Sequence, residues 1–231
     1  MTVLHLADEG EAADFAAFLS RLLHYDRGAA VRLQAAGTAL AVFGRPPSFE
    51  VLAIRAVRLA KPYEHGLDVT LDVTVSAGEI LESIDESAAT VVVPSAVTGP
   101  PWAGVLPPRG GWRPQAGLPA PDGLRAMVAA AVTEFRSRTE ELAPERRTRA
   151  ELDRIGREIW SRTVGDTHLP VRAVHAAQSL GFLRPATRTV GAPDETPLAL
   201  VASGAWLRLR TPYGSIAVRR AGLGALDVSV R

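Results

Sequence analysis

Four strand patterns follow one another between residues 30 and 75 with no helix pattern between them: 30–35, 38–43, 49–59 and 67–75. In the last, Leu and Val alternate with Asp and Thr, which is typical of a strand with one buried and one wet face. The first two predict a hairpin, since only a break at Ala36–Gly37 separates them. Consecutive strands of this kind indicate an antiparallel sheet rather than a doubly wound fold.

Helix patterns surround this sheet. A first helix is expected to begin at Asp8 and a short one at Ser76, because each is followed three residues later by a Glu in capping-box spacing. Residues 90–94 are expected to form a buried strand that ends at its proline.

Three further helices and a meander are expected in the second half. We expect Asp122 to cap the first, Thr148 and Glu151 to open the second, and Pro170 to begin the third, which ends at Gly181. Four short strand patterns follow, at 198–202, 205–210, 215–220 and 226–231.

These elements predict an α+β fold, with an N-terminal antiparallel sheet and helices followed by a C-terminal helical region and a terminal β-meander. The length of 231 residues allows one large domain or two small ones. We place a boundary after residue 121, which gives a sheet domain at 1–121 and a basic domain of helices and a β-hairpin at 122–231.

The first domain ends in a long loop, 94–121, which is rich in Pro and Gly and contains two tryptophans. A loop this long is usually functional or disordered, and tryptophans argue against disorder. It could cover a ligand pocket, with backbone N–H groups at residues 110–111 facing an anion. The candidate ligand residues are Trp102, Arg109, Trp112 and Arg113. Structural packing of the tryptophans is the alternative interpretation.

The strongest candidate for binding is the hairpin 206–220. If residues 212–213 form its tip, Leu209 faces Ile216 and Leu207 faces Val218, and the charged side chains share the opposite face. A type I turn with a bulge at Gly214 would shift the register by one residue and mix the faces. We favour the first register because it separates apolar from charged groups. The predicted binding residues are Trp206, Arg208, Arg210, Arg219 and Arg220.

The helix at 170–180 and this hairpin resemble the recognition helix and wing of a winged helix-turn-helix module. Such modules have three short helices before the wing, and residues 164–169 leave no room for another one. The alternative interpretation is a helical hairpin packed on a small sheet, with its arginines in water.

Charge is distributed unevenly between the two halves. Residues 1–142 contain 12 basic and 17 acidic side chains, whereas residues 143–231 contain 14 basic and 8 acidic ones. All cationic residues except Lys61 are arginines, which is typical of a high-GC coding sequence. The basic half is expected either to bind a polyanion or to attract the acidic half of the same chain.

Several kinds of chemistry find no support in the sequence. There is no cysteine, and the five histidines do not occur in a two-ligand helical spacing with a carboxylate, so we expect no metal and no cofactor. No nucleophile or paired-acid motif is present, so no catalytic residue is assigned. The longest apolar stretch, 126–132, is too short to cross a membrane, and the first residues lack a signal-peptide pattern. We therefore expect a cytoplasmic protein without membrane association.

Two segments, 94–112 and 207–220, resemble those of uncharacterised proteins from high-GC actinobacteria. They cover about a seventh of the chain, and the resemblance implies no activity, cofactor or site residue.

The favoured hypothesis is a non-catalytic binding module whose basic C-terminal face docks a macromolecule, either nucleic acid or an acidic protein. The alternative is a small-molecule-binding protein or enzyme that uses residues 102–113 as a lid. A homo-oligomer that associates through an edge of the meander is a third hypothesis.

Overall fold

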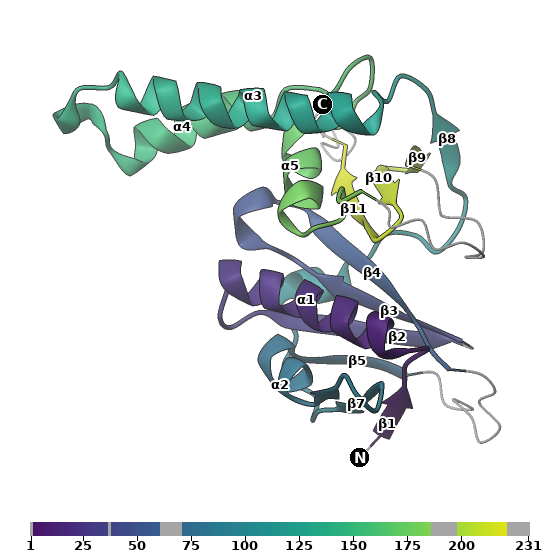
Figure 1. Ribbon diagram of the computed structural model, residues 1–231. Helices are drawn as coiled ribbons and strands as arrows, with labels where there is room; N and C mark the ends of the chain where they lie inside the picture. The colour runs from purple at the N-terminus through teal and green to yellow at the C-terminus, as the bar shows by residue number, and fades with distance from the viewer. Residues whose placement is uncertain (1, 37, 61–70, 186–197, 221–231) are drawn as a thin grey trace, which may run out of the picture.

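Strands from both halves of the chain form one antiparallel sheet (Figure 1). The computed structural model describes residues 2–36, 38–60, 71–185 and 198–220. Within these residues the large sheet has eight strands. In spatial order they are β5 (Leu71–Ser76), β2 (Ala30–Ala36), β3 (Ala39–Gly44), β4 (Leu52–Arg58), β11 (Gly214–Arg219), β10 (Trp206–Thr211), β9 (Ala199–Ser203) and β8 (Arg113–Gln115).

A smaller antiparallel sheet lies beside it, in the order β1 (Thr2–His5), β7 (Thr90–Val93) and β6 (Ile84–Asp85). The helices are α1 (Glu9–Tyr25), α2 (Ala77–Glu82), α3 (Pro121–Glu140), α4 (Arg149–Trp160) and α5 (Val171–Ser179). Three 3₁₀ turns are η1 (Pro47–Phe49), η2 (Pro101–Gly104) and η3 (Pro144–Arg146). In Figure 1, α1 crosses the strands of the first half, and α3 and α4 project from the body as a helical arm. The predicted α+β class is confirmed.

Side-chain caps start three helices where the sequence predicts them. The Asp8 carboxylate accepts the N–H of Glu11 at 2.8 Å, and the hydroxyls of Ser76 and Thr148 each accept the N–H three residues on at 3.3 Å. These bonds satisfy N–H groups that lack a partner within the helix. The capping signals are therefore confirmed at these three positions.

Asp122, in contrast, does not cap α3, and that expectation was wrong. The cap position is Ala120, and Pro121 occupies the first turn, where its fixed φ suits a helix start. Asp122 lies in the first turn and forms an ion pair with Arg125. Similarly, α5 begins one residue after Pro170.

Other observed element boundaries differ less from the predicted ones. The strand expected from residue 49 begins at Leu52, because a 3₁₀ turn occupies Pro47–Phe49. The long loop contains η2 and the short strand β8. The expected strand segments at 67–70 and 226–231 lie outside the described residues.

The pairing of β4 with β11 joins the two halves, and the sequence did not predict it. Ser215 lies opposite Ile54 and Ala217 opposite Leu52, so the C-terminal meander extends the first sheet. A single apolar core also spans both halves, and the rings of Phe18 and Phe182 stack at 5.6 Å within it. The boundary after residue 121 stays a prediction.

Helices pack on one face of the large sheet, and the long loop packs on the other. On one face, α1 and α5 bury side chains such as Leu33, Leu209 and Ile216. The opposite face, here called the loop face, carries Phe43 and Ile54, against which Trp102 of the long loop packs. The Arg32 guanidinium on this face donates to the Ala103 carbonyl. The long loop therefore lies against the sheet.

A buried ion pair connects α1, β4 and the β10–β11 hairpin. Arg55 Nη2 donates to Glu11 Oε1 at 2.8 Å, and Nη1 donates to the Tyr213 carbonyl at 2.8 Å. The two charged side chains are only 7% and 6% exposed. A buried charge that loses its partner is strongly destabilising.

We therefore expect Glu11→Gln to lower the free energy of unfolding by about 2–3 kcal/mol, because Arg55 and Arg58 would both lose the carboxylate that they share, and only Asp14, at 3.5 Å, would remain as a counter-charge for the buried Arg55. Urea titration at neutral pH measures this. The control is Glu9→Gln in the same turn, which is exposed and should change stability by less than about 0.5 kcal/mol. Equal losses of stability in Glu11→Gln and Glu9→Gln would contradict the interpretation that the buried Arg55 depends on the Glu11 carboxylate.

Ion pairs also connect the two helices of the arm. Arg138 on α3 donates to both carboxylate oxygens of Glu158 on α4, at 2.7 and 2.8 Å. Arg162 donates to Glu134 on α3. The hydrogen bond from Arg138 is the main cause that lowers the pKa of Glu158 from 4.5 to about 2.

A carboxylate whose pKa is lowered by folding stabilises the protein above its unfolded pKa, and this contribution is lost as the pH falls through the folded pKa. The free energy of unfolding of the unaltered chain should therefore fall as the pH is lowered from 4.5 to about 2. We expect this fall to be smaller in Glu158→Gln, because the variant has no carboxylate to protonate at this position. Thermal unfolding at several pH values measures this slope. Glu140→Gln, on an exposed position of the same arm, should leave the slope unchanged.

Candidate functional site

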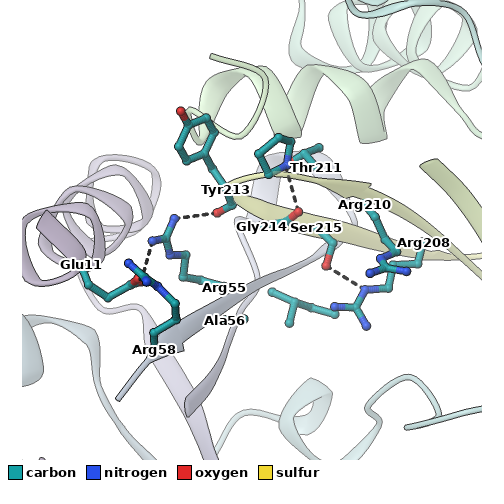
Figure 2. Close-up of a pocket in the computed structure, with 12 residues that line it drawn as sticks. Glu11, Arg55, Ala56, Arg58, Arg208, Arg210, Thr211, Tyr213, Gly214 and Ser215 are labelled. Carbon is teal, nitrogen blue, oxygen red and sulfur yellow. Dashed lines mark hydrogen bonds and ion pairs between the residues drawn. The ribbon is translucent and has the colours of Figure 1, made fainter. Parts of the chain in front are cut away.

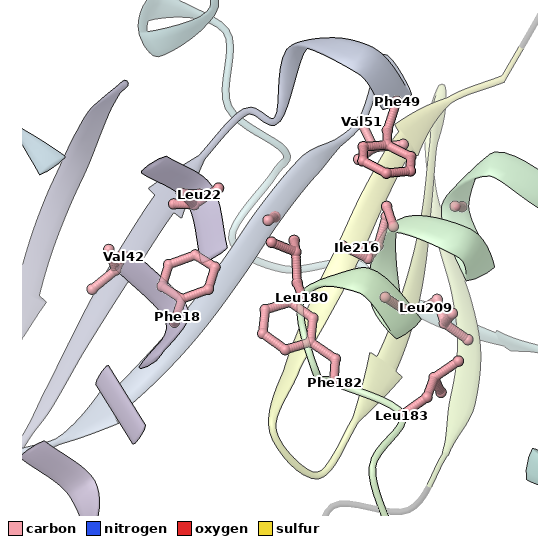
Figure 3. Close-up of a cluster of buried hydrophobic side chains, with 14 of the residues drawn as sticks. Phe18, Leu22, Val42, Phe49, Val51, Leu180, Phe182, Leu183, Leu209 and Ile216 are labelled. Carbon is pink, nitrogen blue, oxygen red and sulfur yellow. The ribbon is translucent and has the colours of Figure 1, made fainter. Parts of the chain in front are cut away.

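The β10–β11 hairpin has the register that the sequence favours. Leu209 lies opposite Ile216 and Leu207 opposite Val218, with a two-residue turn at Pro212–Tyr213. These four side chains are at most 2% exposed. Figure 3 shows Leu209 and Ile216 near Leu180 and Phe182. The apolar face of the hairpin is therefore fixed in the core, and the other face must carry the charged residues.

Four predicted residues come together on the loop face of this hairpin: Trp206, Arg208, Arg210 and Arg219, here called the basic face. Trp206 pairs with Arg219 across the two strands, and the Arg219 guanidinium lies 5.4 Å from the centre of the Trp206 ring. Arg208 lies 5.9 Å from the ring of Trp112 in the long loop. Such contacts hold guanidinium groups against aromatic faces.

The arginines of the basic face form no ion pair among the described residues. Arg208 Nε donates to the Ser215 hydroxyl at 2.8 Å, and no ion pair joins Arg208, Arg210 or Arg219 to a carboxylate in this part of the chain. Burial, and secondly the like charge of Arg210, lower the pKa of the Arg208 guanidinium. The arrangement is therefore one that an anion would stabilise.

Charges of the two halves do pair elsewhere, as the sequence allows. Arg184 pairs with Asp14 on α1, and Arg172 Nε lies 4.0 Å from Glu50. The general attraction between the halves thus uses other arginines and leaves the basic face unpaired within the described residues.

The remaining predicted residues lie in different surroundings. Arg220 follows β11, and its Nε is buried with no hydrogen bond among the described residues. Arg113 pairs with Ala202 in β8–β9, on the face opposite Arg208. Arg109 is exposed, and its charge contributes to lowering the pKa of Asp72, although the hydrogen bond from Arg32 contributes most.

The two tryptophans of the long loop are half-buried at the sheet. Trp102 packs on the small apolar cluster of Phe43 and Ile54, which Trp206 also contacts. Trp112 Nε1 donates to the Pro108 carbonyl at 3.0 Å. The loop thus brings aromatic groups to the basic face.

A hollow of about 290 Å³ lies where the hairpin tip parts from β4. Figure 2 shows its lining, with Arg55 bonded to Glu11 and Tyr213, and Arg208 bonded to Ser215. Arg58 and Arg210 complete a set of four arginines. Sequence reasoning missed Arg55 and Arg58, although a charge inside the apolar run of β4 signals a buried pair.

This arrangement can bind anions by charge-assisted hydrogen bonds. Among the described residues, no three His, Asp or Glu side chains gather as a metal site.

Two family profiles cover nearly the whole chain. One, a domain of unknown function (DUF8185), matches residues 107–223, which is just over half of the sequence. The chain belongs to the DUF8185 family. The other, a domain of unknown function (DUF8010), matches residues 1–104. The DUF8185 segment contains the whole β10–β11 hairpin, whereas β4 and Glu11 lie in the DUF8010 segment.

A search of curated proteins finds no match to the chain, and neither does a search of solved structures. None of the helices within the described residues is both long and apolar enough to cross a membrane.

Gly214 allows the hairpin of the DUF8185 segment to approach the core closely. A Cβ atom at this position would lie 2.6–2.8 Å from the ring of Phe182, which is 2% exposed. Real Cβ atoms do not make contacts this short, so the ring or the hairpin would have to move.

We expect Gly214→Ala to lower the free energy of unfolding by about 1–3 kcal/mol through overpacking. Chemical denaturation measures the change, and Gly110→Ala, where a Cβ meets nothing within 4 Å, is the control. In a Phe182→Leu background the penalty of Gly214→Ala should become smaller, because the two sites are in contact. An unchanged penalty in that background would contradict this explanation.

Proposed function

We propose that the protein is a non-catalytic binding protein whose basic face docks single-stranded nucleic acid. The observation that carries the proposal is the set of three arginines on one sheet face, next to two tryptophans and without a carboxylate partner among the described residues. Guanidinium groups bind phosphates, and aromatic rings and guanidinium planes stack on bases.

The geometry favours a flexible strand over a duplex. The arginines lie on a sheet face that includes half-buried tryptophan rings, rather than on a protruding helix that could enter a groove. Sheet surfaces with aromatic and basic side chains are typical of proteins that bind single strands.

The alternative of a lid formed by residues 102–113 gains less support. Neither the 290 Å³ hollow nor a larger one near the helical arm is lined by any of these residues. Self-association through the meander stays a prediction. Its outer strands are already paired, β11 with β4 and β9 with β8, so within the part of the chain that the structure describes the outermost strand there is the short β8. A cytoplasmic location and an actinobacterial source belong to this proposal as well.

The test is fluorescence anisotropy of a labelled oligothymidylate of about 20 nucleotides, titrated with the full chain over a salt series. We expect the logarithm of the binding constant to fall linearly with the logarithm of the salt concentration. Arg210→Gln with Arg219→Gln should reduce the slope by about 1.4, because each phosphate that an arginine neutralises on a single strand adds about 0.7 to it. Both side chains are exposed, so the fold should persist.

The control replaces Arg136 and Arg146, which are exposed on or beside the arm, with Gln. It changes the net charge equally and should leave the slope unaltered. Absent binding at low salt, or equal losses in both double variants, would refute the proposal. A duplex of the same length should bind more weakly, and equal affinity would refute the role of stacking.

A further inference from the structure

A groove of about 930 Å³ lies between the helical arm and the body, away from the basic face. Its lining comes from the end of α1, from η1 and from α3, α4 and α5. None of the basic-face residues is part of it. Its volume is within the range of pockets that hold small molecules of cofactor size.

Five rings from these separate elements form a continuous wall of this groove, here called the aromatic groove. Tyr25 and His175 each contact the Phe49 ring edge-to-face, at 5.2 and 5.1 Å. His175 stacks on Trp160 at 4.6 Å, and the tilted ring of Phe135 lies 6.1 Å from that of Trp160. The rings converge on one concavity and do not form a stripe along a single helix, which favours a compact ligand over a docked helix.

Structural packing explains only part of this wall. Phe49 is 6% exposed and belongs to the core, but Phe135, Trp160 and His175 are only half-buried. Neither the indole N–H of Trp160 nor the imidazole of His175 has a hydrogen bond among the described residues. Polar atoms of this kind in an aromatic hollow are available to a ligand.

The rim has an excess of positive charge. It includes Arg149, Arg157 and Arg172 against Glu50 and Asp153. Arg149 is paired with Asp153 at 3.8 Å, whereas Arg157 has no ion pair in the described part of the chain. Arg172 Nε is buried without a hydrogen bond there, and its carboxylate neighbour Glu50 is 4.0 Å away.

We propose that the aromatic groove binds a small molecule with a flat aromatic ring and an anionic substituent. The ring lies against Trp160 and His175, and the anion accepts hydrogen bonds from Arg157 and Arg172. The burial of His175 lowers the pKa of its imidazole, which favours the uncharged ring as a stacking partner. Charge selection then depends on the two arginines.

The test uses three probes with the same ring, which are naphthoate, naphthyl phosphate and the neutral naphthamide, measured by isothermal titration calorimetry on the full chain. We expect at least one of the anions to bind about tenfold more tightly than naphthamide, because charge-assisted hydrogen bonds are about twice as strong as neutral ones. The stronger anion identifies the substituent, carboxylate or phosphate.

Arg157→Gln should reduce the affinity for the preferred anion about tenfold and leave that for naphthamide unchanged. Arg157 is exposed, so the variant should fold. Arg136→Gln, on an exposed position of α3 outside the groove, is the matched control and should bind like the unaltered chain. Saturation should also shift the NMR signals of the His175 imidazole.

No saturable binding, equal affinity for all three probes, or equal losses in the two arginine variants would overturn the proposal. The Arg210→Gln and Arg219→Gln double variant should bind the anion normally. The two proposals are therefore tested independently. A failure of nucleic-acid binding at the basic face does not contradict ligand binding in the aromatic groove, and a failure of ligand binding does not contradict nucleic-acid binding.

Discussion

The arrangement of the molecule depends on the buried guanidinium of Arg55. It lies where α1, β4 and the tip of the β10–β11 hairpin meet, and it donates to the Glu11 carboxylate and the Tyr213 carbonyl. Both charged groups are removed from water and need opposite charge nearby, which Asp14 also supplies to Arg55 and Arg58 to Glu11. This interaction helps to align β11 beside β4 and makes one sheet of strands from both halves of the chain.

Once β11 lies beside β4, the two sides of the hairpin have different surroundings. Its apolar side chains join the core beneath α5, whereas its arginines lie on the loop face with the tryptophans of the long loop. Other arginines find carboxylates, for example on the helical arm, where Arg138 binds Glu158. The contrast between paired arginines on the arm and unpaired ones on the basic face within the described residues supports a binding role for the hairpin.

Much of the local structure could be predicted from the sequence. The caps at Asp8, Ser76 and Thr148 and the register of the hairpin depend on contacts between residues close in the chain. Asp122 was misassigned because Pro121 provides an equally good helix start one residue earlier. Neither the β4–β11 pairing nor the aromatic groove has a local signal, since their residues are far apart in sequence.

By itself the sequence determined the helices and the longer strands and which side of each is apolar, because periodicity and capping act over a few residues. The short strands β1, β6 and β8 were not predicted from it. It also determined that the hairpin has one charged side. Only the tertiary structure decided that Arg55 meets Glu11, that the basic face has no ion-paired carboxylate among the described residues, and that rings from five elements line one groove. Such contacts join residues distant in the chain, and they form only when the core brings those segments together.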